Sequence, residues 1–87
     1  PHLMLHSSGA IIMSIGRREA PFGIRAVVSF DNGVTWSDEY IIRDDAPDGD
    51  LGYPATTELD DGSLITVYYM KYKGDKKTSI LYTKWRL

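Results

Sequence analysis

Short runs of β-branched, aliphatic and aromatic residues, separated by turn-forming residues, are the main pattern along the chain. No segment keeps a helical apolar period over three turns. Turn formers lie between the runs, and two of these turns, 60–62 (DDG) and 73–75 (KGD), predict hairpins. The pattern therefore predicts an all-β, antiparallel fold. The runs are HLMLH (2–6), AIIMSIG (10–16), IRAVVSF (24–30), EYIIR (39–43), PATTEL (54–59), SLITVYYM (63–70) and SILYTKW (79–85).

Some of these runs are apolar at consecutive positions rather than at alternating ones. Residues 11–13 read Ile-Ile-Met, and residues 67–69 read Val-Tyr-Tyr. A strand with one face in water alternates apolar and polar residues, whereas a continuous apolar run indicates a strand that is covered on both faces. We therefore expect sheets that stack on other sheets.

The two halves of the chain share a pattern. The segment PHLMLHSSGAII, from Pro1, aligns without a gap with PATTELDDGSLI, from Pro54, at an offset of 53 residues. Repeats of about 40 to 50 residues with four short antiparallel strands are typical of propeller blades. The sequence predicts a four-stranded blade over residues 1–43, followed by an acidic loop and three strands of the last blade over residues 44–87. The absent eighth strand, and a start within an expected strand, suggest part of a longer protein.

Composition narrows the classes of partner. The chain has 87 residues, no cysteine and a net charge of −2. It is one small domain at most, without disulfides or thiolate-bound metal. We expect neither nucleic acid nor membrane as a partner, because nucleic acid and anionic lipid both require a basic patch and no run is long enough to span a bilayer. The composition does not exclude a neutral or sugar-like ligand. We also expect no cofactor and no metal, because the acidic loop 43–50 lacks the spacing and the glutamate of an EF-hand.

The segment SFDNGVTWS, from position 29, carries a regular set of residue types. In such a segment an aspartate can accept hydrogen bonds from turn amides, a glycine can adopt a positive φ, and a tryptophan can cover the hairpin. We interpret the motif as a hairpin turn between the third and fourth strands rather than as a catalytic element. Its residues are Ser29, Asp31, Gly33, Thr35 and Trp36.

This motif resembles the Asp-box, or BNR repeat, of the sialidase (neuraminidase) superfamily, whose members are six-bladed β-propellers. The stretch Gly52-Tyr53-Pro54-Ala55, with the later DG turn at 61–62 and the strand 64–69, is similar to the segment that carries the catalytic tyrosine of those enzymes. The resemblance covers essentially the whole chain as about two blades at the C-terminal end of such a propeller. It implies a glycoside hydrolase that cleaves terminal, anionic sugars with retention.

The resemblance also implies roles for two residues. Tyr53 corresponds to the nucleophile, and a neutral phenol avoids the repulsion that a carboxylate nucleophile would meet at an acidic sugar. Arg25 corresponds to an arginine that binds the sugar carboxylate through its guanidinium fork. The family's glutamate, acid/base aspartate and other two arginines would lie on other blades. Pro54 and Met70 stand where the family has serine and glutamate.

For several other residues, and for the function itself, the sequence leaves alternative interpretations open. Arg17 and Arg18 either line the opening of the same sugar site or form a solvated strand end. Asp50 either approaches that site as an acid or caps its loop. His2 either faces the central channel of the propeller or is structural. Tyr53 itself either catalyses or packs at a strand entry. The protein is alternatively a non-catalytic propeller module that binds glycan or protein, or a lyase that uses Tyr53 as a base. Because open blades expose edges and faces, we expect docking with the remaining blades or self-association.

Overall fold

The computed structural model describes residues 1–72 and 74–87, which form seven β-strands. Each expected run overlaps one strand and all pairs are antiparallel, so the prediction of an all-β fold is confirmed. The predicted turn at 73–75 includes Lys73, which lies outside the described residues. Over the described ranges, no helix has the length and apolarity needed to cross a bilayer. The strands are β1 (His2–Leu5), β2 (Ile11–Arg17), β3 (Gly23–Ser29), β4 (Tyr40–Arg43), β5 (Gly52–Glu58), β6 (Leu64–Met70) and β7 (Ser79–Trp85).

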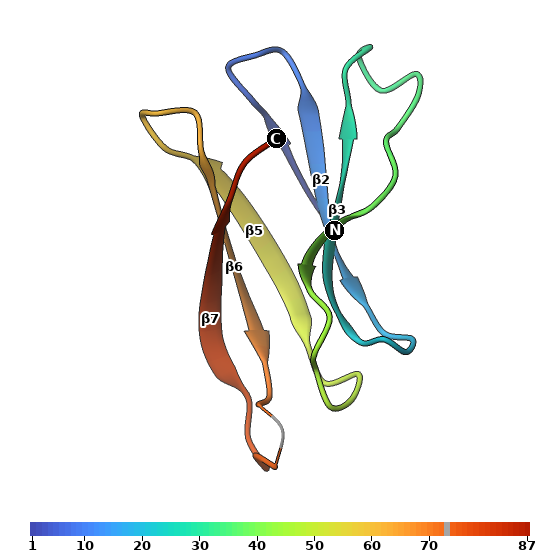
Figure 1. The fold of residues 1–87 in the computed structure, drawn as a ribbon, viewed down its shortest axis with the longest axis vertical. Helices are drawn as coiled ribbons and strands as arrows, with labels where there is room; N and C mark the ends of the chain where they lie inside the picture. Colours follow the sequence, from blue (N-terminus) through green and yellow to red (C-terminus); the bar gives the residue numbers. More distant parts are fainter. Residues whose placement is uncertain (73) are drawn as a thin grey trace.

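The strands form two sheets, one in each predicted half of the chain. The first sheet has the order β1-β2-β3-β4, and the second has the order β5-β6-β7. Figure 1 shows the two twisted sheets side by side, with β5 next to the first sheet. Strand β5 contacts β1 and β2, and β7 contacts β4. The sheets therefore stack on each other, and the ends of β1, β2 and β5 come together.

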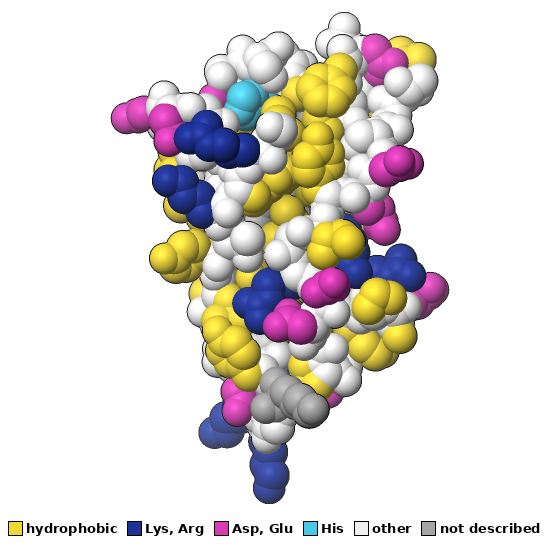
Figure 2. Space-filling model, viewed as in Figure 1, with side chains coloured by type: hydrophobic (Ala, Val, Ile, Leu, Met, Phe, Trp, Pro, Cys, Tyr) yellow, Lys and Arg dark blue, Asp and Glu magenta, His cyan; other side chains and the backbone are white. Residues whose placement is uncertain are grey.

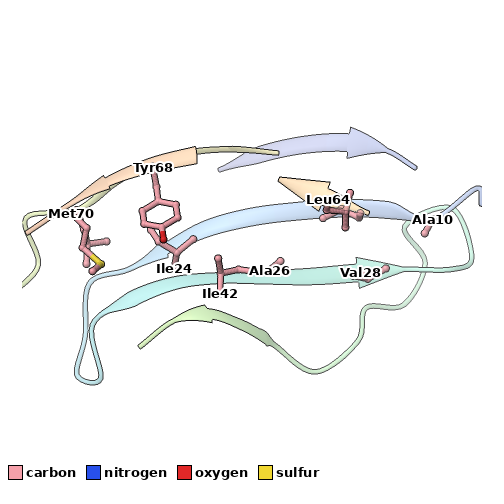
Figure 3. Packing of buried hydrophobic residues seen from close by; sticks show 10 residues of the cluster. Ala10, Ile24, Ala26, Val28, Ile42, Leu64, Tyr68 and Met70 are labelled. Carbon is pink, nitrogen blue, oxygen red and sulfur yellow. The ribbon is translucent and has the colours of Figure 1, made fainter. Parts of the chain in front are cut away.

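The hydrophobic core lies between the two sheets. Ile24, Ala26 and Val28 are fully buried on β3, while Leu64 and Tyr68 are buried on β6. Figure 3 shows these side chains pointing into the space that separates the strands. Burying one large aliphatic side chain stabilises a fold by about 1.5–3 kcal/mol, so this layer is the main force that holds the sheets together.

A chain of buried polar side chains crosses the same interface. The hydroxyl oxygens of Ser14 on β2 and Thr56 on β5 lie 2.5 Å apart, and those of Thr56 and Thr66 on β6 lie 2.8 Å apart. Trp85 on β7 donates its indole N–H to the Thr66 hydroxyl at 2.9 Å. Buried hydroxyls are stable only when hydrogen-bonded, so this chain specifies how the two sheets are aligned.

The sequence repeat is a repeat of structure. The turns at 6–10 and 59–63 each have the same two backbone hydrogen bonds, of 2.8 and 2.9 Å. Gly9 and Gly62 occupy equivalent positions in them, with φ of 92° and 83°. The bounds of β2 and β6 also differ by the same offset at both ends, and β1 pairs with β2 in the register in which β5 pairs with β6.

Candidate functional site

The segment from Ser29 to Trp36 forms the connection between β3 and β4. The Ser29 hydroxyl donates to Asp31 Oδ1 at 2.8 Å and accepts the Gly33 N–H at 2.7 Å. Asp31 Oδ1 also accepts the Thr35 N–H at 2.8 Å, and its Oδ2 accepts the Thr35 hydroxyl. Gly33 has a φ of 86°, and the Trp36 ring lies beside it. These are the hydrogen bonds of a turn, and they occupy the polar groups of the motif.

The same contacts change the acidity of Asp31. Hydrogen bonds from the Thr35 side chain, the Thr35 backbone and the Ser29 side chain lower the pKa of Asp31 from 3.8 to about 2. Because the folded-state pKa is the lower one, the stabilisation is fully present above the unfolded pKa. It is lost as the pH falls from about 4 towards about 2.

We therefore expect Asp31→Asn to reduce the pH dependence of stability. The wild-type melting temperature should fall between pH 4 and pH 2, and the variant should lose less over that range while melting at a lower temperature near pH 7. Thermal unfolding followed by circular dichroism measures both. Asp44→Asn changes the charge equally at an exposed position and is the matched control. Identical pH profiles of the melting temperature for Asp31→Asn and wild type would contradict the claim that the hydrogen bonds of Asp31 stabilise the fold.

A pocket of about 490 Å³ lies where the start of β1, the end of β2 and the start of β5 meet. Three of the residues predicted for the site, His2, Arg18 and Tyr53, come together here from distant parts of the chain. The rest of the lining is mainly apolar side chain and glycine. The lining includes His2, Ile15, Gly16, Arg18, Gly52 and Tyr53.

Tyr53 extends into solvent from a strained backbone position. Its side chain is 85% exposed, and its φ is 45°. The register of β5 on β6 shifts between Gly52 and Ala55, so Tyr53 lies in a bulge. A positive φ is unusual for a bulky residue and costs about 1–3 kcal/mol, and such strain often marks functional sites. The Tyr53 ring is tilted against that of Tyr69, with 5.6 Å between centroids.

Arg18 is the basic side chain of the pocket. Its Nε and Nη2 donate to the Leu51 carbonyl at 3.3 and 3.0 Å, which fixes the guanidinium beside Gly52. Of the ion pairs found across residues 1–72 and 74–87, none involves Arg18. The remaining guanidinium N–H groups are thus available to an anionic ligand.

The floor of the pocket is backbone. A Cβ atom on Gly16 would lie 3.1 Å from Leu51 Cδ1 and 3.4 Å from the Gly52 Cα, so a larger residue there would require the Leu51 side chain to shift by a few tenths of an ångström. His2 accepts the Thr56 N–H at Nδ1, at 3.2 Å, which holds its ring at the rim. The sequence predicted no role for Gly16, and Gly52 entered only as part of the stretch that carries Tyr53; the signal was their position next to the Arg17-Arg18 pair and Tyr53.

Arg25 does not reach this pocket. It is only 3% exposed, and its guanidinium donates to the carbonyls of Pro21 and Ile24, at 3.1 and 3.2 Å, and to that of Arg43. Arg25 pairs with Ile15 on β2, but it is not itself among the residues that line the pocket. The buried guanidinium therefore bonds to backbone acceptors and does not line the pocket that holds Tyr53.

Arg17 and Asp50 have other partners. Arg17 lies 3.9 Å from Glu39 in a neighbouring pocket of about 350 Å³, which shares Arg18 with the first. Asp50 lies 3.4 Å from Lys71 Nζ, and neither Asp50 nor any other acid is among the lining residues of the Tyr53 pocket in the described part of the chain. Within those residues, no group of three or more potential metal ligands is gathered.

Comparison with known proteins gives a structural neighbour. No family model and no curated protein sequence matches the chain. The chain is similar to a protein of unknown function from Dyadobacter fermentans whose crystal structure is known, with a TM-score of 0.85 and 27% identity. The similarity covers 99% of this chain and 24% of that protein, so this chain spans about a quarter of its neighbour's length.

Proposed function

We propose that this chain forms two adjacent blades of a sialidase-like β-propeller. In this proposal it contributes the nucleophile, Tyr53, to a glycoside hydrolase site for a terminal acidic sugar. The blades are supported by the repeated turn, strand bounds and register in the two sheets. The Asp-box resemblance is supported by the hydrogen bonding of Asp31 and Ser29.

The observation that carries the catalytic part is the exposed and strained Tyr53 in a pocket that also holds Arg18. In a retaining reaction, the Tyr53 oxygen attacks the anomeric carbon as its proton passes to a base on another blade, while the glycosidic C–O bond breaks and the departing oxygen takes a proton from an acid on another blade. Water then attacks the tyrosyl-linked sugar and releases it. Arg18 would bind the sugar carboxylate, a task that its fixed guanidinium suits.

A second candidate function is binding without catalysis. A tyrosine nucleophile needs a base to remove its proton, and in the described part of the chain no carboxylate lines the pocket. The base would come from another blade. If no blade supplies it, the same pocket is a carbohydrate-binding site, with the Tyr53 ring as a stacking surface.

The experiment is an assay of the full-length protein with a fluorogenic α-sialoside and with the corresponding neutral glycoside, followed by product analysis. We expect release of free sugar from the acidic substrate at a higher kcat/KM than from the neutral one. Binding without turnover would contradict the hydrolase and support the second candidate. A product with a new carbon–carbon double bond would instead indicate a lyase with Tyr53 as base.

A further inference from the structure

A lysine holds the loop that leads into Tyr53. Lys71, the first residue after β6, places its Nζ 3.2 Å from Asp48 Oδ2 and 3.4 Å from Asp50 Oδ2. Its side chain is mostly buried, whereas those of the two aspartates are about half exposed. The hydrogen bond to Asp48, and then that to Asp50, raise the pKa of Lys71, so the lysine stays charged at neutral pH. In Figure 2, acidic and basic side chains lie next to each other near the middle of the molecule.

A second basic residue, Arg18, holds the same loop. The repeat offset of 53 residues makes Lys71 the equivalent of Arg18, and each directly follows the second strand of its sheet, β2 or β6. Arg18 donates to the Leu51 carbonyl, while Lys71 binds the two carboxylates. Residues 48–51 are therefore held by two equivalent basic residues, one from each sheet, and the two have different partners.

The two aspartates flank a residue that touches Arg18. This residue is Gly49, and a Cβ atom placed on it would lie 3.8 Å from Arg18 Cβ. The carbonyl that Arg18 binds belongs to Leu51, the residue after Asp50. A guanidinium prefers a carboxylate to a carbonyl, because both groups are charged and two parallel hydrogen bonds can form. Among the ion pairs of residues 1–72 and 74–87, however, Arg18 has no carboxylate partner, whereas Lys71 has two.

We infer that Lys71 keeps the carboxylates of Asp48 and Asp50 away from Arg18, and so leaves the guanidinium open to an anionic ligand. Without the lysine charge, either half-exposed carboxylate can pair with Arg18 and compete with that ligand. Lys71 is thus a positioning residue, which acts on Arg18 through the aspartates and is not among the described residues that line the pocket. Its effect on ligand binding rests on the proposed anion site at Arg18.

The test is a double-mutant cycle in the 87-residue chain, between Lys71→Met and the pair Asp48→Asn with Asp50→Asn. N-acetylneuraminic acid is the probe, and an NMR titration gives its Kd. Lys71→Met alone should raise the Kd about threefold to fivefold, because an exposed ion pair with an aspartate then competes for Arg18. The asparagine pair alone should leave the Kd close to that of wild type. Combined with Lys71→Met, it should restore the wild-type Kd.

A second readout does not use the sugar. The Nε–H signal of Arg18 should shift in the Lys71→Met chain, because the guanidinium gains a carboxylate partner, and it should return in the combined variant. Lys77→Met, in an exposed loop, removes the same charge and should leave this signal and the Kd unchanged. If the wild-type chain does not bind the sugar, the proposed anion site is wrong, but the Arg18 signal still tests the role of Lys71.

Two results would overturn the inference. One is an unchanged Arg18 signal in a folded Lys71→Met chain, since it means that neither aspartate moves to Arg18. The other is additive effects of the two sets of substitutions on the Kd, since they mean that the charges act on the sugar only through the general field. If circular dichroism shows that the Lys71→Met chain is unfolded, Lys71→Gln, which keeps an N–H donor, replaces it.

Discussion

Replacing Tyr53 with phenylalanine is expected to lower the kcat of the full-length protein on an acidic glycoside by about 10³-fold or more, as loss of a covalent nucleophile does. The substitution removes one oxygen and keeps the ring that contacts Tyr69. Sugar binding should therefore change little, and KM should stay within a few-fold of its wild-type value. Steady-state kinetics with separate kcat and KM values measure the effect.

The control for this prediction is Tyr82→Phe. Tyr82 is also an exposed tyrosine on the second sheet, but it does not line the pocket, so its loss of a hydroxyl should leave kcat unchanged. A Tyr53→Phe enzyme that retains its kcat would show that Tyr53 is not the nucleophile. In that case the strained backbone would serve only to place the ring against the ligand.

Arg25→Met is expected to lower the free energy of unfolding by about 3 kcal/mol, because hydrogen bonds from a buried charged group to backbone acceptors would be lost. Methionine fills much of the volume but donates nothing to the carbonyls of Pro21, Ile24 and Arg43. Urea unfolding of the variant and wild type measures the difference. The resemblance to sialidases implies a loss of ligand binding instead.

Arg18→Met is the matched variant. Arg18 is exposed and bonds to one carbonyl, that of Leu51, so its replacement should change stability by no more than about 1 kcal/mol. Its effect should fall on ligand binding. Equal destabilisation by the two substitutions would contradict the assignment of a structural role to Arg25 and a ligand role to Arg18.

The sequence predicted the features that depend on local residue types. The seven strands follow from apolar runs between turn formers, and the turn chemistry of Ser29, Asp31 and Gly33 follows from hydrogen bonds over a few residues. The repeat also aligned Gly9 with Gly62, which occupy equivalent turn positions with positive φ. In these cases the physical cause is contained in a short segment, so the segment is enough to predict it.

The site was predicted less well because its causes are distant in sequence. The guanidinium of Arg18 is fixed by the carbonyl of Leu51, which is 33 residues away in the sequence. Arg25 donates to the carbonyls of Pro21, Ile24 and Arg43, and the last of these is on β4. The positive φ of Tyr53 arises from a bulge, which no residue preference for tyrosine indicates. Choosing between the two arginines therefore required the folded chain.

The most direct test of the account is a titration of the isotope-labelled 87-residue chain with N-acetylneuraminic acid, followed by NMR chemical shifts. The account predicts saturable shifts at Arg18, Tyr53 and Gly16, which are absent with a neutral methyl glycoside and absent in Arg18→Met. Shifts of equal size in the Arg18→Met chain, or no shift at these residues at saturating sugar, would contradict the claim that this pocket binds an acidic sugar.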